Sequence, residues 1–158
     1  MKKHIILLTA LMSISMTAYG QHLFFIGEES YLSTEAYSLS ANSESEKDLN
    51  IAFAKDSNYA FVAVRLEISY GNQFHGKLII YLDDGNVVSL EDQVVRDYID
   101  WIALAVYSLP EEEIRKLKSG NINTVRYEMR GSLAGSGNFS SSNRSGINFP
   151  EIVSEFFE

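Results

Sequence analysis

Cysteine is absent from this chain of 158 residues, which also contains only three histidines, two prolines and one tryptophan. Without cysteine, the chain cannot form disulfides, bind a metal through thiolates, use a cysteine nucleophile or carry a lipid-anchored cysteine. Basic residues are also few: 13 lysines and arginines stand against 21 acids, a formal net charge of −8. Because phosphate contacts need lysine and arginine, this balance argues against nucleic acid and anionic lipid surfaces as partners.

One apolar run stands out, and it lies at the N-terminus. Two lysines precede an apolar stretch over about 5–16, and small residues follow it up to residue 20. This three-part layout is typical of a secretory signal peptide over 1–20, with cleavage before Gln21. The run is shorter than the roughly 20 residues that span a bilayer, so we predict no transmembrane segment. Loss of the leader would take the formal charge to −10 and place 21–158 in the periplasm or outside the cell.

Alternation of apolar and polar residues dominates residues 21–158, for which we predict a single β-rich domain. Leu49, Ile51 and Phe53 share one face at period two, and turn residues separate them from a second alternating run over 59–69. This pair predicts a hairpin. A short apolar run predicts a strand at 23–26, and an alternating segment predicts a half-exposed strand at 122–130. The polar segment 27–47 is either a long surface excursion or an edge hairpin through 31–40.

A second hairpin is indicated around Asp84 and Gly85, where glycine supplies the positive φ that a tight turn requires. We expect its strands near 76–82 and 87–90. The segment 101–109, WIALAVYSL, is apolar on both parities, which favours a central strand covered on both faces; a short buried helix is the alternative.

A short helix is predicted at about 109–119. Ser108 and Glu111 have the spacing of a capping box, and Gly120 is placed to end the helix in the left-handed region. Acids begin this segment and bases end it, as the helix dipole favours. Its two apolar side chains make a narrow buried stripe, which is typical of a connector.

A second short helix is predicted at the C-terminus. Asn148 and Glu151 again have capping-box spacing, with Pro150 in the first turn. We expect its apolar face, which includes Phe156 and Phe157, to dock on the domain; the alternative is binding in a partner's groove. Before it, residues 131–146 are rich in Gly, Ser and Asn, which predicts a flexible loop.

Candidate chemistry centres on acids. Oxygen-rich loops could hold calcium through Asp83, Asp84, Asp92 and Asp97, although the spacing does not match an EF-hand, and turn formation is the favoured role of Asp83 and Asp84. Paired carboxylates for a hydrolase could be drawn from the same region, from Asp83, Asp84, Glu91, Asp92, Asp97 and Asp100. The sequence contains no G-x-S-x-G motif of serine hydrolases, and an enzyme is not the favoured hypothesis. Apart from calcium, we expect no cofactor.

Tyrosine is abundant, with nine residues against one tryptophan. Exposed aromatic rings give large, rigid contact areas, so a protein- or glycan-binding face is a further hypothesis. Its candidate residues are Tyr31, Tyr37, Tyr70 and Tyr98, with Phe156 and Phe157 as a separate apolar pair. Cross-strand packing is the ordinary role of such residues.

The leader MKKHIILLTA and the segment YSLPEEEIRKLKSGNINTVRYEM, residues 107–129, resemble small exported proteins of unassigned function from the Bacteroidota. The resemblance implies export and carries no activity or site residue.

Together these patterns predict a mainly β fold, an antiparallel sheet that forms a β-sandwich with two short helices; α+β is the alternative. The leading functional hypothesis is a non-catalytic binding or interaction module of the cell envelope with a protein or glycan partner. The alternatives are a carboxylate-dependent hydrolase and a purely structural envelope protein. Neither the ligand nor the oligomeric state follows from the sequence.

Overall fold

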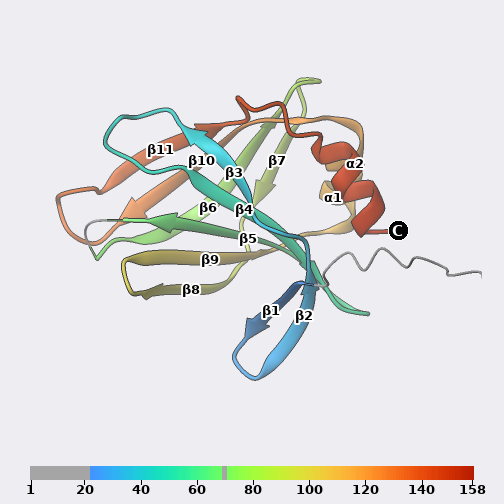
Figure 1. Cartoon of the computed structure of the whole chain (residues 1–158), viewed down its shortest axis with the longest axis horizontal. Helices are drawn as coiled ribbons and strands as arrows, with labels where there is room; N and C mark the ends of the chain where they lie inside the picture. The colour runs from blue at the N-terminus through green and yellow to red at the C-terminus, as the bar shows by residue number, and fades with distance from the viewer. Residues whose placement is uncertain (1–21, 69–70) are drawn as a thin grey trace, which may run out of the picture.

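The computed structural model describes residues 22–68 and 71–158, and within these residues strands form one antiparallel sheet (Figure 1). The predicted signal peptide, its cleavage site before Gln21 and Tyr70 lie outside the described residues. The elements are β1 His22–Ile26, β2 Glu29–Ser33, β3 Tyr37–Ala41, β4 Leu49–Lys55, β5 Ala60–Glu67, β6 Gln73–Leu82, β7 Val87–Leu90, β8 Gln93–Ile99, β9 Ile102–Ser108, α1 Glu111–Ser119, β10 Ile122–Arg130, β11 Gly137–Ser142 and α2 Phe149–Phe156.

The sheet has the order β7-β6-β10-β11-β3-β4-β5-β9-β8, with β1 and β2 beside this path. One half of the sheet is β7-β6-β10-β11 and the other is β3-β4-β5-β9-β8. They are joined by two residue pairs between β11 and β3, and they pack face to face around one core. On the far side, the Tyr107 hydroxyl donates to the Gly76 carbonyl at 3.0 Å, which ties β9 to β6. The predicted fold class, mainly β and antiparallel with two short helices, is confirmed.

The main core comes from the period-two faces of the strands. Leu49, Ile51 and Phe53 of β4 and Val62 and Val64 of β5 are fully buried. Their two strands pair as the predicted hairpin. β6 and β7 form the second predicted hairpin, in which Gly85 has a φ of 87°. The apolar segment 101–109 contains β9, which lies between β5 and β8 as a central strand.

The N-terminal segment is built differently from either alternative for 31–40. β2 and β3 do not pair with each other; both pair with β4, β3 at its start and β2 at its end. β1 folds back on β2, and this hairpin projects from the body of the sheet (Figure 1). Phe24, Ile26 and Tyr31 cover a small second core on the outer face of the sheet.

The start of α1 corrects the predicted capping box. Ser108 is the last residue of β9, where it pairs with Phe61, so its side chain does not cap the helix. Pro110 is the N-cap residue and offers no side-chain hydrogen bond. The acids and bases do lie at the expected ends, and the ion pair that forms joins Lys116 to Glu113 at 2.8 Å.

The end of α1 corrects the role of Gly120. Its φ is −123°, in the extended region and not the left-handed one. A Cβ atom at this position would lie 2.7 Å from the carboxylate of Asp84. Close approach of the β6–β7 turn, and not backbone conformation, therefore requires glycine here.

We expect Gly120→Ala to lower the free energy of unfolding by about 1 kcal/mol through overpacking. The Asp84 carboxylate cannot move away without breaking hydrogen bonds of 2.9 and 3.0 Å from Asn86. Urea denaturation of both single variants and of Asp84→Ala/Gly120→Ala measures the coupling. The cost of Gly120→Ala should disappear in the Asp84→Ala background; an equal cost in both backgrounds would contradict the steric explanation.

Two segments were predicted less well. Residues 131–146 are not a continuous loop, because β11 occupies their centre and pairs with β10 and β3. The buried Asn72 holds the remaining turn through hydrogen bonds to Ser132 and Ala134. The acidic stretch before β9, for which no strand was predicted, contains the edge strand β8.

The C-terminal helix is as predicted. The Asn148 side chain accepts a hydrogen bond from the Glu151 amide at 3.3 Å, and Pro150 lies in the first turn. Phe149 and Val153 are fully buried, so α2 docks on its own domain. Neither helix in the described part of the chain has the length and hydrophobicity needed to cross a membrane.

Candidate functional site

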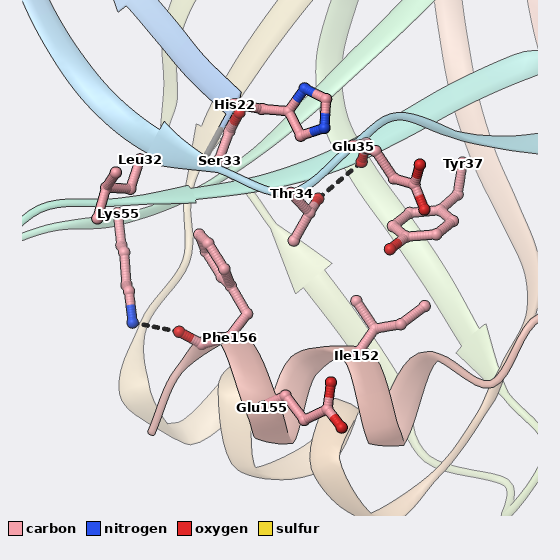
Figure 2. Close-up of a pocket in the computed structure, with 10 residues that line it drawn as sticks. All are labelled: His22, Leu32, Ser33, Thr34, Glu35, Tyr37, Lys55, Ile152, Glu155 and Phe156. Atoms are coloured by element: carbon pink, nitrogen blue, oxygen red, sulfur yellow. Dashed lines mark hydrogen bonds between the residues drawn. The ribbon is translucent and has the colours of Figure 1, made fainter. Parts of the chain in front are cut away.

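A groove of about 670 Å³ runs between α2 and the strands around the β2–β3 connection (Figure 2). We call it the α2 groove. One wall is the segment from β2 to β3, the opposite wall is α2, and Lys55 lies at one end. Its lining residues are His22, Leu32, Ser33, Thr34, Glu35, Tyr37, Lys55, Ile152, Glu155 and Phe156.

The strand wall is fixed by Thr34, which continues the sheet between β2 and β3. Its amide donates to the Phe53 carbonyl at 2.9 Å, and its hydroxyl accepts a hydrogen bond from the Phe53 amide at 3.1 Å. The same hydroxyl donates to the Glu35 carbonyl at 2.8 Å. These three bonds hold the backbone of Glu35 against β4, so its side chain starts from a defined position at the groove.

The helix wall is fixed by Phe149 at the start of α2. Its ring makes edge contacts with Tyr37 and Phe53, with centroids 5.7 and 6.3 Å apart. Its amide donates to the Asn121 side chain at 3.1 Å. With this end anchored, Ile152 and Phe156 point from α2 toward the strand wall, and Glu155 lines the groove from the same helix (Figure 2).

Lys55 links the two walls at the far end of α2. Its ammonium donates to the backbone carbonyl of Phe156 and lies 4.9 and 5.9 Å from the ring centroids of Phe156 and Phe157. A cation at a helix C-terminus is favoured by the helix dipole, and cations are attracted to aromatic faces. The ammonium group of Lys55 therefore already interacts with the C-terminal end of α2 and its aromatic rings.

The other end of the groove is acidic. Burial raises the pKa of Tyr37 above its usual value, and the negative charges of Glu35 and Glu155 raise it further. Both carboxylates therefore lie close enough to Tyr37 to act on its hydroxyl, although they come from opposite walls. The Glu35 and Glu155 side chains make none of the ion pairs found among the described residues.

Comparison with known proteins gives no match: no protein-family model, no curated protein and no solved structure matches this chain. The groove and its lining residues are therefore the basis of the functional proposal.

The predicted tyrosine face is not assembled as one surface. Tyr37 lines the α2 groove, whereas Tyr31 packs edge-on against Phe61 at 5.1 Å in the second core. Tyr98, at the end of β8, contacts the exposed Trp101 in the β8–β9 turn. Of the candidate aromatic residues that the structure describes, Tyr37 and Phe156 line the groove. Phe157 packs on Phe53 instead.

The candidate calcium ligands lie apart from the α2 groove. Asp83 accepts a hydrogen bond from the Asn121 amide at 2.8 Å. Hydrogen bonds from Asn86 lower the pKa of Asp84. Asp84 thus stabilises the β6–β7 turn, and Asp83 joins this turn to the segment after α1. Asp92 precedes β8 and Asp97 lies on it. Among residues 22–68 and 71–158, no three His, Cys, Asp or Glu side chains are grouped closely enough to hold a metal ion.

The acidic residues of the groove, Glu35 and Glu155, were not among the predicted site residues, and neither was Lys55. Each is a single charge in an unremarkable local pattern, and the two ends of the Lys55 contact are 101 residues apart in the chain. The partial signal was the apolar face of the C-terminal helix, which indicated docking and so the position of the groove.

Proposed function

We propose that this chain is an exported, non-catalytic binding module of the cell envelope, and that the α2 groove is its ligand site. The leader-like residues 1–20 and the resemblance to small exported Bacteroidota proteins support export. The groove is the single structural observation that carries the binding role, because a concave site lined by apolar side chains and a few polar groups is typical of ligand sites.

The carboxylates suggested for a hydrolase give less support to that alternative. Asp84 accepts a hydrogen bond within the β6–β7 turn, and Asp83 accepts one from Asn121. The groove is lined by none of the six candidate carboxylates, Asp83, Asp84, Glu91, Asp92, Asp97 and Asp100. A protein or glycan partner remains our proposal for the ligand.

Thermal unfolding of residues 21–158 with glycans, short peptides or calcium tests the binding role. A ligand present at about 100 times its Kd should add about 2.7 kcal/mol, which raises Tm by several degrees. Glu155→Trp, which fills the groove from an exposed helix position, should abolish this rise. Asp92→Ala and Asp97→Ala serve as matched controls and should retain it.

Two results would contradict the proposal. Loss of the Tm rise in the aspartate variants, with retention in Glu155→Trp, would favour the acidic strands as the site. The absence of any rise with all three classes of ligand would favour a purely structural role.

A further inference from the structure

The charges of the α2 groove are separated along its length. Glu35 and Tyr37 lie toward one end in Figure 2, and Lys55 lies at the other end with Phe156. Ile152, from α2, points toward the strand wall between them, and Glu155 lies along the same helix. Among the ten lining residues, two carboxylates stand against one lysine.

Lys55 is not available to attract an anionic ligand to the groove. Its ammonium already donates to the Phe156 carbonyl and lies over two aromatic rings. An anionic ligand would have to displace these contacts and approach Glu35 and Glu155. A cationic ligand would leave them intact and would gain two carboxylate partners.

The acidic end also provides the other features that an organic cation requires. Tyr37 presents an aromatic ring, half buried and held against Phe149. Ile152 provides an apolar surface on the α2 wall of the groove. Carboxylates give charge-assisted hydrogen bonds to ammonium and guanidinium groups, and aromatic rings attract the same groups.

Resting on the binding role proposed above, we propose that the α2 groove binds a ligand with an ammonium or guanidinium group on an apolar stem. The cation lies between Glu35 and Glu155 beside the Tyr37 ring, and the stem lies along Ile152. This chemistry is found both in small alkylamines and in the lysine or arginine side chains of a peptide.

The test is an NMR titration of residues 21–158 with n-hexylammonium, n-hexanol and hexanoate, which share one stem and differ in charge. Hexylammonium should bind about tenfold more tightly than hexanol, since two exposed ion pairs contribute on this scale. Hexanoate should bind more weakly than either. The backbone amide shifts should centre on Glu35, Tyr37 and Glu155, and the affinity should fall with added salt.

The matched variants are Glu35→Gln/Glu155→Gln and Glu44→Gln/Glu67→Gln, which change the net charge equally. Glu44 and Glu67 are exposed and lie outside the groove. The first pair should lose about tenfold in affinity for hexylammonium, and the second pair should keep it. Unchanged melting of both pairs shows that a loss is not due to unfolding.

A blocked peptide, acetyl-Leu-Lys-Leu-amide, and its Gln analogue distinguish the two sources of the cation. Tighter binding of the Lys peptide than of hexylammonium indicates a protein partner, and the reverse order indicates a small amine. Equal binding of hexylammonium, hexanol and hexanoate, or unchanged binding in the Glu35→Gln/Glu155→Gln variant, would overturn the inference. If cationic probes fail while another ligand's Tm rise is lost in Glu155→Trp, the binding role stands and only the ligand class is wrong.

Discussion

Replacement of Phe149 by alanine should lower the free energy of unfolding by about 3–5 kcal/mol, the usual cost of deleting a buried phenylalanine. The side chain is fully buried and makes edge contacts with Tyr37 and Phe53. It therefore joins α2 to β3, which contains Tyr37, and to β4, which contains Phe53. Urea denaturation of residues 21–158, followed by circular dichroism, measures the change.

Phe156→Ala is the matched control, because Phe156 has the same side chain on the same helix but is only half buried. Its removal should cost clearly less, since less apolar area is exposed and the contact with Lys55 is partly solvated. Amide hydrogen exchange of α2 should increase in Phe149→Ala more than in Phe156→Ala. Equal losses in the two variants would show that α2 is not anchored through Phe149.

Most strands were predictable because their information is local. In β4, β5 and β10, every second side chain is apolar, and those side chains form the core in the structure. The β6–β7 hairpin followed from its Asp-Gly pair, since glycine adopts the positive φ that such a turn needs. A period of two identifies a strand without information on its neighbours.

The strands that were not predicted, β8 and β11, lack the alternation of apolar and polar side chains that identifies a strand. β11 consists largely of small polar residues, yet Ser141 is fully buried and pairs with both neighbours of the strand. Its place is set by the gap between β10 and β3, which is a property of the tertiary structure. β8 carries charged side chains because it is an edge strand, and charge on an edge limits pairing with other chains.

The two capping boxes show how one pattern led to opposite outcomes. Asn148 follows no strand, so its side chain is available to accept from the Glu151 amide. Ser108 has the same spacing from Glu111, but its backbone belongs to β9 and its amide donates to the Asp92 carbonyl. The α2 groove was hidden for a related reason: its residues come from segments whose proximity depends on β2 and β3 sharing β4.

The stability of the chain should fall between pH 10 and pH 12 because two buried tyrosines resist ionisation. Burial raises the pKa of Tyr107 to about 12 from its usual 10.0. Burial, with the nearby charge of Glu46, also raises the pKa of Tyr127. Over this interval the unfolded chain loses these protons and the folded chain keeps them. The stabilisation is complete below pH 10 and is lost as the pH rises through the folded-state values.

For Tyr107 alone, a difference of about two pKa units corresponds to a loss that approaches about 2.7 kcal/mol well above pH 12. Urea denaturation at pH 8 and at about pH 11.5 should therefore differ by about 2 kcal/mol from this residue. Tyr127 adds to the difference in the same direction.

Tyr107→Phe should change both ends of this comparison. At pH 8 it should cost about 1–3 kcal/mol, because the Gly76 carbonyl loses a donor and the Gln93 side chain loses an acceptor. At high pH the variant should lose less further stability than the parent chain, since one of the two titrating groups is gone. Tyr59→Phe is the control at an exposed phenol and should leave the pH dependence unchanged. An equally steep alkaline loss in Tyr107→Phe would show that Tyr107 is not the group that titrates.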